Sequence, residues 1–316
     1  MIATLTMNPA VDRTVIVNGF RPGGLNRVKE VRVDASGKGI NVSKALLKLG
    51  FGSMALGFLG GNEGRFIAEE VMQAGIAARF TWLEGRSTRT NVKVFDEATG
   101  ETTELNEPGP SVREADLERL KEDIDRALGE CTHLICSGSL PPGVTDDFYA
   151  NLVERANERG VYCVLDTNGP ALVKGVRKRP FMIKPNADEI ADIMGRPLKS
   201  VPDLVTAVKT LLAESIVIVI LSLGADGAIF GSREGIFWSR AAAEVVRSTA
   251  GCGDALVAAA VASLASGRDW EETARFATAV AVATAGMEGT AFPSLDEVER
   301  VVDKVQVNRL PGGSAA

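Results

Sequence analysis

A run of small residues before an apolar helical stretch is the segment best suited to chemistry. Residues 248–254 read Ser-Thr-Ala-Gly-Cys-Gly-Asp, and the helical pattern continues over 255–266. The N–H groups of residues 251–254 would point out of the helix start, where the helix dipole also favours negative charge. Such a cradle suits the charge that develops on a transferring phosphoryl group, and Asp254 beside it could accept a proton from an attacking hydroxyl. The same pattern also fits a purely structural role, with Asp254 as the N-cap of a buried helix.

A second glycine turn precedes another helical pattern near the amino terminus. Residues 34–41 read Asp-Ala-Ser-Gly-Lys-Gly-Ile-Asn and lead into the helical stretch 42–49. Backbone donors of this turn, together with Lys38, could bind a sugar or a phosphate, and the Asn41 amide offers both a donor and an acceptor to a hydroxyl. Taken alone, the segment is better explained as an ordinary glycine turn with an Asn near the helix start.

The elements that must position these motifs follow an alternating pattern from Cys131 onward. Strands are expected at 132–137, 161–166, 181–183 and 215–222. Helices are expected at 145–159, 186–194, 203–213, 254–266, 270–286 and 295–305. This alternation predicts an α/β fold with a mostly parallel sheet covered by helices on both faces, and in such sheets ligands bind beyond the carboxyl ends of the strands.

The first third of the chain predicts a small β-rich lid added to this body. A buried strand is expected at 2–7, and short strands at 27–33, 79–83, 91–96 and 101–105. In the first of the short strands, Val28, Val31 and Val33 are available to a core. We therefore expect one domain over residues 1–310, with lid strands drawn from about 11–33 and 79–105, and a disordered tail at 311–316.

Composition and charge exclude several classes of protein. The 316 residues contain 35 Lys and Arg against 41 Asp and Glu, a net charge of −6, which argues against a partner nucleic acid or membrane surface. No apolar stretch reaches the ~18 residues of a membrane span, and the amino terminus lacks the basic region of a signal peptide. The four cysteines form no Cys-x-x-Cys pair, so we expect a protein of the reducing cytoplasm.

Two common nucleotide-binding signatures are absent. The sequence contains no Gly-x4-Gly-Lys-Ser/Thr, and its only Gly-Lys pair, at 37–38, is followed by another glycine. The segment 57–64 has the wrong glycine spacing for the dinucleotide fingerprint. The first absence excludes a P-loop enzyme, and the second argues against a nicotinamide dehydrogenase.

Together, the two glycine motifs resemble those of the PfkB-type carbohydrate kinases, the ribokinase-like family. The resemblance covers residues 1–305, and it implies a ribokinase-like fold with ATP and Mg2+ as cofactors. Supporting segments occur in the expected order at 8–12, 88–91, 137–143, 184–189 and 222–227. Within the family, the branch that phosphorylates hexose phosphates is the most similar.

The resemblance also implies a role for individual residues. Asp254 corresponds to the catalytic base, and the anion cradle comprises Gly251, Cys252 and Gly253. The residues implied to bind the sugar phosphate are Asp12, Arg27, Gly37, Lys38, Gly39, Asn41, Arg89 and Ser139, with Arg27 on a lid strand. The residues implied to bind ATP are Lys184, Asn186, Ser222, Gly224 and Gly227, and Glu189 is implied to hold Mg2+ through water.

Several of these residues have a structural alternative. Asp12 could initiate a turn after Pro9, Glu189 could be a surface residue of its helix, and Arg89 could serve only an ion pair. Cys252 is read as a space-filling residue, although a helix N-terminus would lower the pKa of its thiol and make it sensitive to thiol reagents.

The expected substrate is a small sugar phosphate. Arg89 and the segment 137–143 favour an acceptor that already carries a phosphate, and the first choice is conversion of fructose 1-phosphate to fructose 1,6-bisphosphate. Tagatose 6-phosphate and fructose 6-phosphate remain open as acceptors, and so does a non-catalytic sensor of sugar phosphates. Because protruding lid strands leave exposed edges, a homodimer through the lid is also expected.

Overall fold

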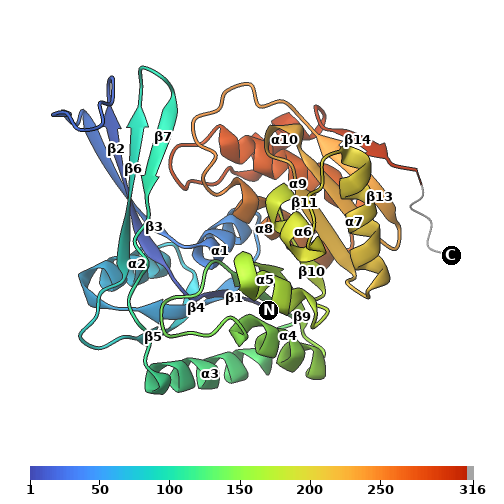
Figure 1. The fold of residues 1–316 in the computed structure, drawn as a ribbon, viewed down its shortest axis with the longest axis horizontal. Helices are drawn as coiled ribbons and strands as arrows, with labels where there is room; N and C mark the ends of the chain where they lie inside the picture. Colours follow the sequence, from blue (N-terminus) through green and yellow to red (C-terminus); the bar gives the residue numbers. More distant parts are fainter. Residues whose placement is uncertain (312–316) are drawn as a thin grey trace.

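The computed structural model describes residues 1–311, which form a large sheet and a separate four-stranded lid (Figure 1). The large sheet has the order β14-β13-β12-β11-β10-β9-β8-β1-β4-β5. Its strands are β1 (Ile2–Thr6), β4 (Ser53–Leu59), β5 (Ala77–Trp82), β8 (His133–Ser137), β9 (Tyr162–Asp166), β10 (Met182–Ile183), β11 (Ile218–Ser222), β12 (Ala228–Ser232), β13 (Gly235–Arg240) and β14 (Gln306–Arg309). The expected tail lies outside the described residues except for Pro311.

The sheet is parallel from β11 to β5, as the alternation of strands and helices predicts. Central strands such as β1 are buried along their whole length, because helices cover both faces of a parallel sheet. The strands β12, β13 and β14 form an antiparallel edge that the sequence analysis did not anticipate. The short connections from β11 to β12 and from β12 to β13 allow antiparallel neighbours, whereas a parallel neighbour needs a long crossover. Strand β14 follows α10 and pairs with β13 from the other end of the last helices.

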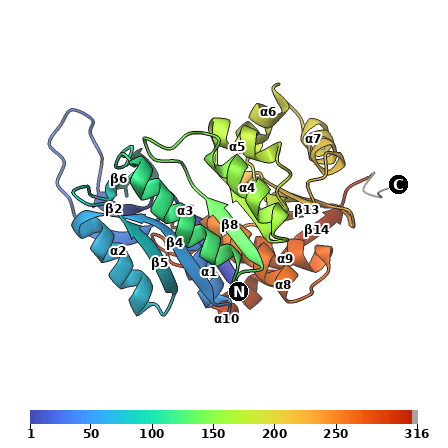
Figure 2. The same cartoon turned by 90° about the horizontal axis from the view of Figure 1, so that it is seen from below.

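Helices pack on both faces of this sheet, which Figure 2 shows from below. One face is covered by α1 (Lys38–Lys48), α2 (Gly61–Gln73), α8 (Cys252–Ala265), α9 (Trp270–Ala285) and α10 (Leu295–Val302). The other is covered by α3 (Glu114–Leu128), α4 (Phe148–Glu158), α5 (Gly169–Val176), α6 (Ala187–Met194) and α7 (Val201–Ala213). Helix α8 is apolar on all sides and almost wholly buried between the sheet and its neighbours. No helix among residues 1–311 is long and apolar enough to cross a membrane.

The lid is a second sheet with the order β3-β2-β6-β7, and it projects from the body at the upper left of Figure 1. Its strands are β2 (Ala10–Val17), β3 (Glu30–Ser36), β6 (Arg89–Asp96) and β7 (Glu101–Leu105). Because side chains alternate along a strand, the lid has two unlike faces. Asp12, Asp34 and Asn91 are cross-strand partners on the polar face. Val33, Arg13, Val92 and Leu105 form one row across the opposite face.

Two expectations about the lid are wrong. The strand expected at 79–83 belongs to the large sheet, because β5 pairs in parallel with β4 along the edge of the body. An edge strand is half exposed, so its residue pattern looks like that of a lid strand. Val31 and Val33 of β3 are 42% and 45% exposed, because the lid is a single layer beyond its base, where Val11 and Ala35 pack into a core cluster with Ile67. Val28 is 50% exposed and lies in the loop before β3.

Candidate active site

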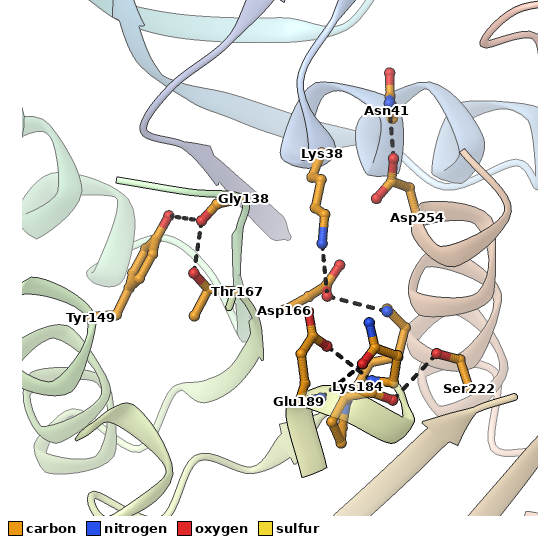
Figure 3. Close-up of polar contacts among 12 residues, drawn as sticks. Lys38, Asn41, Gly138, Tyr149, Asp166, Thr167, Lys184, Glu189, Ser222 and Asp254 are labelled. Carbon is orange, nitrogen blue, oxygen red and sulfur yellow. Dashed lines mark hydrogen bonds and ion pairs between the residues drawn. The ribbon is translucent and has the colours of Figure 1, made fainter. Parts of the chain in front are cut away.

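The motif residues meet where the parallel strands end, at the carboxyl edge of the large sheet (Figure 3). Strand β9 ends at Asp166, Lys184 directly follows β10, and β11 ends at Ser222. The amino termini of α1 and α8 point into the same region, so that Lys38 and Asp254 lie on either side of it. The topology therefore brings together segments that are more than 200 residues apart in the chain.

The first glycine turn needs glycine because α1 begins directly against β1. A side chain at position 39 would place its Cβ 2.5 Å from Thr6 Oγ1 and 2.8 Å from the Leu5 carbonyl oxygen. Thr6 Oγ1 instead accepts a hydrogen bond from the Ile40 N–H at 3.0 Å. Gly37, the N-cap of α1, has φ of 139°, which favours glycine. This close approach delivers Lys38 and Asn41 to the sheet edge.

The second glycine motif forms the expected helix start. Gly251 is the N-cap of α8 in the left-handed region, with φ of 81°, and Cys252 and Gly253 are the first helical residues. A Cβ at Gly251 would lie 3.3 Å from the Phe292 ring, and one at Gly253 would lie 3.4 Å from Lys184 Nζ. The Lys184 ammonium therefore lies close to the first turn of α8, whose N–H groups a helix leaves unpaired, and both favour an anion there.

Asp254 is placed and perturbed as a general base requires. It is buried in the first turn of α8, and its Oδ2 accepts a hydrogen bond from Asn41 Nδ2 at 2.8 Å. Burial and the nearby charge of Asp166 raise the pKa of Asp254 to about 7, against the opposing effects of Lys38, Asn41 and Lys184. A carboxylate with this pKa exists in both protonation states near neutral pH, so it can take up a proton and release it again.

Asp166 is a site residue that the sequence analysis missed. Its Oδ1 forms ion pairs with Lys184 Nζ at 3.2 Å and with Lys38 Nζ at 3.3 Å (Figure 3). Burial opposes the charge, but the two lysines outweigh it and lower the pKa of Asp166, while Asp166 in turn raises the pKa of Lys38. The signal was available: Asp166 is the last residue of an expected strand, where ligand-binding residues of such sheets occur.

The expected nucleotide side is built on a helix start and two turns. Asn186 and Glu189 form a capping box at α6, because Asn186 Oδ1 accepts the Glu189 N–H at 2.8 Å and Glu189 Oε2 accepts the Asn186 N–H at 2.9 Å. Ser222 donates through its Oγ to the Pro185 carbonyl at 3.3 Å. These contacts join the ends of β10 and β11 and orient Lys184 toward Asp166.

The turn after β11 holds Gly224 and Gly227. Both have positive φ, 60° and 85°, and a Cβ at Gly227 would lie 2.1 Å from the Ser239 carbonyl oxygen. A Cβ at Gly224 meets no atom within 4 Å, so that position faces open space. The turn therefore leaves room for a ligand beside the backbone at Gly224, and the role of both glycines in ATP binding stays a prediction.

On the sugar side, the structure brings Arg89 and Ser139 together through Asn8. Arg89 Nη2 donates to the Asn8 carbonyl at 3.0 Å and Nη1 donates to the Glu107 carbonyl at 2.8 Å. Asn8 Nδ2 donates to Ser139 Oγ at 3.4 Å. The Arg89 Nε is buried and has no partner among the described residues. Asn8 was not among the expected site residues, because its contacts with Arg89 and Ser139 form only where the end of β1 meets these two segments.

The two residues expected on lid strands, Asp12 and Arg27, have different surroundings. Asp12 accepts hydrogen bonds from Asn91 Nδ2 at 3.0 Å and from Lys93 Nζ at 2.8 Å on the polar face of the lid. Its role as a sugar contact stays a prediction. The placement of Arg27 on a lid strand is wrong, since Arg27 is an exposed residue of the loop that precedes β3. This loop follows the turn at residues 22–24 and meets β2 only at its end, where the Lys29 N–H donates to the Ile16 carbonyl at 2.8 Å.

For Cys252, only the expectation of a lowered thiol pKa is wrong. Burial, together with the charge of Asp254, raises the pKa of the Cys252 thiol to about 11. The effect of the helix N-terminus is outweighed because a thiolate there would sit beside a carboxylate. Cys252 fills space at the helix start, and all four cysteines are free thiols.

Comparison with known proteins identifies the family. A model described as pfkB family carbohydrate kinase matches residues 5–297. The chain belongs to the pfkB family. Among curated relatives, the 1-phosphofructokinase of Rhodobacter capsulatus is 35% identical over 311 residues, which cover 98% of each chain.

Solved structures of the pfkB family confirm the expected ribokinase-like α/β fold. A possible 1-phosphofructokinase from Thermotoga maritima matches with a TM-score of 0.90 at 32% identity, over 98% of this chain and 99% of that one. The phosphofructokinase-2 of Escherichia coli, solved in complex with substrates and products, matches with a TM-score of 0.90 at 28% identity, over 96% of this chain and 98% of that one. Such coverage makes this pfkB-family chain comparable to these relatives along its whole length.

Proposed function

We propose that this chain is an ATP-dependent 1-phosphofructokinase that converts fructose 1-phosphate to fructose 1,6-bisphosphate. The observation that carries the proposal is Asp254, a buried carboxylate with a pKa of about 7 at the start of α8. A sensor of sugar phosphates has no need for such a base. The choice of acceptor is supported by the relatives named 1-phosphofructokinase and by Arg89 beside Ser139.

In the proposed reaction, the phosphate already on the sugar binds on the side of Arg89 and Ser139. The free primary hydroxyl then lies beside Asp254, and its oxygen forms a bond to the γ-phosphorus while the bond from that phosphorus to the bridging oxygen of ADP breaks. The hydroxyl proton passes to the Asp254 carboxylate. The N–H groups of Gly251–Gly253 and the ammonium of Lys184 stabilise the charge on the phosphoryl oxygens.

The described residues also suit a hydrated Mg2+ ion. Asp166 Oδ2 is buried and has no partner among residues 1–311, and Glu189 uses Oε2 for its capping contact. Carboxylate oxygens accept hydrogen bonds from the waters that Mg2+ retains. When bound with ATP, the ion neutralises phosphate charge, and we propose that Glu189 and Asp166 hold it through its waters.

The deciding experiment is ADP release from magnesium–ATP with separate acceptors. We expect turnover with fructose 1-phosphate and a large kcat/KM preference over fructose 6-phosphate, tagatose 6-phosphate and unphosphorylated fructose. A preference for another phosphorylated ketose would move the assignment within the same branch. Binding of ATP without turnover of any of the four acceptors would favour the sensor.

We propose further that the protein is a homodimer through the outer face of the lid. Val31 and Val33 on β3 and Leu105 on β7 are 42%, 45% and 60% exposed, and they lie on the face opposite Asp12. A one-layer sheet with an apolar outer face is stabilised by a second copy of that face. Light scattering should give a mass about twice that of the 33.4 kDa chain. We propose a cytoplasmic location for the enzyme, where ATP and sugar phosphates are available.

A further inference from the structure

The segment between α9 and α10 touches both the lid and the anion cradle. Residues 286–292 follow the last turn of α9 and run between β3 of the lid and the start of α8. None of these residues belongs to the expected site. Their contacts toward the lid are polar, and toward the cradle they combine an ion pair with an aromatic ring.

On the lid side, the contact is an ion pair and a tight backbone approach. Glu288 Oε2 lies 2.8 Å from Arg32 Nη2 of β3. Gly289, with φ of 59°, follows directly, and a Cβ there would lie 2.8 Å from Asp34 Oδ2 and 3.2 Å from Arg32 Nη1. The lid thus rests on this segment through two residues of one strand face, the face that also carries Asp12.

On the other side, the same carboxylate reaches the loop that leads into the cradle. Glu288 Oε1 lies 3.2 Å from Arg247 Nη1. The N–H groups of Arg247 and Ser248 donate to the Ala285 carbonyl at 2.8 Å and 3.2 Å. Phe292 is buried, and its ring would be the first atom group met by a side chain at Gly251. The position of residues 247–251 therefore depends on the position of 285–292.

We infer that Glu288 is a positioning residue that ties the lid to the anion cradle, with Arg32 on one side and Arg247 on the other. One carboxylate shared by two guanidinium groups holds the lid strand and the cradle loop in a single arrangement. The inference rests on the proposed function for its catalytic meaning: the sugar phosphate and ATP, bound on opposite sides, would each favour the arrangement that the other needs.

The link can be tested without any ligand by hydrogen exchange. In Arg32→Gln, which changes only the lid, we expect the backbone N–H groups of residues 245–253 to exchange about two- to fivefold faster, since an exposed ion pair contributes up to about 1 kcal/mol. The matched control is Lys29→Gln, which removes another exposed lid ion pair, with Glu97 at 2.8 Å, that does not touch residues 286–292. Unchanged exchange at 245–253 in Arg32→Gln, or an equal change in Lys29→Gln, overturns the inference.

A second measurement reads the coupling between ligands. The affinity for fructose 1-phosphate is measured by calorimetry with and without a non-hydrolysable ATP analogue. In the wild type we expect each ligand to increase the affinity for the other. The coupling factor is the ratio of the Kd for fructose 1-phosphate without and with the ATP analogue. In Glu288→Gln we expect this coupling factor to fall about two- to fivefold, and in Arg32→Lys we expect it to stay close to that of the wild type. An undiminished factor in Glu288→Gln contradicts the inference. If the proposed function is wrong, the wild type shows no turnover in the ADP-release assay. The hydrogen-exchange test needs no ligand, so its result does not depend on that outcome.

Discussion

At the scale of single residues, a buried carboxylate with a pKa near neutrality costs stability and provides a base. Asp254 lies among Asp166, Lys38 and Lys184, and it stays near half-protonated only because burial and Asp166 outweigh the two lysines. Asp166 has the opposite balance, since both lysines pair with it directly. In the proposed function, these two carboxylates have different tasks, Asp254 as an acceptor of protons and Asp166 as an anion that orients the lysines.

Replacing the base should separate chemistry from folding. Asp254→Asn is expected to keep the fold and ATP binding and to lose roughly 10²–10⁴-fold in kcat, the usual contribution of a general base. Steady-state kinetics and nucleotide titration measure the two effects. Because the pKa of Asp254 is raised in the folded state, wild-type stability falls as pH rises from about 4 to about 7. The variant should therefore melt at a higher temperature than the wild type at pH 8 but not at pH 4. Normal turnover of the variant would remove the base assignment.

The same pKa predicts the pH dependence of activity. The base must be deprotonated in the free enzyme, so log kcat/KM should rise with unit slope below pH 7 and level off above it. Burial is the main cause of the raised pKa, so the inflection should lie well above that of an exposed aspartate. Measurement of initial rates between pH 5 and 9, with saturation by Mg2+ at every pH, tests this. An inflection near pH 4 would contradict the assigned environment.

In the proposed function, Arg89 binds a part of the substrate that does not react. Its guanidinium donates hydrogen bonds to the carbonyls of Asn8 and Glu107, and its Nε is buried without a partner among the described residues. Arg89→Ala should raise the KM for the sugar phosphate by one to two orders of magnitude, about 1.4–3 kcal/mol for a charged contact, and change kcat much less. The KM for ATP serves as the internal control. A loss confined to kcat would place Arg89 in the chemistry instead.

At the scale of elements, the start of α8 depends on one backbone conformation. Gly251 has φ of 81° and lies against Phe292, so Gly251→Ala strains the backbone by about 1–2 kcal/mol and displaces the ring. We expect a lower melting temperature and a loss of kcat larger than the loss of stability explains. Gly75→Ala is the matched control, since Gly75 has φ of 80°, no neighbouring atom within 4 Å and no place in the expected site. Equal effects on kcat in both variants would mean that strain alone is responsible.

At the scale of the whole molecule, the apolar outer face of the lid predicts assembly. The double variant Val31→Lys, Val33→Lys places two charges on the exposed row of β3 without touching the polar face. Light scattering should then give a monomer, because two charges buried in an apolar interface have no partner there. The matched control is Val217→Lys, a residue of the body that is 46% exposed. A wild-type monomer, or a variant that remains dimeric, would contradict assembly through this face.

Local patterns in the sequence determined much of this protein. The alternation of strands and helices after residue 131 and the two glycine turns before helices follow from short segments, because each depends on neighbours within about one helical turn. The roles expected of Asp254, Lys38 and Lys184 stay predictions, and that of Lys184 rests on the family resemblance alone. The antiparallel edge of the large sheet and the parallel pairing of β5 do not follow from short segments, because an exposed edge strand has the same pattern of apolar and polar residues in either sheet.

Only the tertiary structure decided the charges of the site and the contacts of the lid. The pKa of Asp254, the pairing of Asp166 with two lysines and the position of Asn8 between Arg89 and Ser139 arise between segments up to 213 residues apart. The burial that raises the pKa of Cys252 also comes from packing between distant segments, whereas the helix start alone predicts a lowered pKa. Electrostatic environment and desolvation are properties of the packed arrangement, so no local pattern carries them.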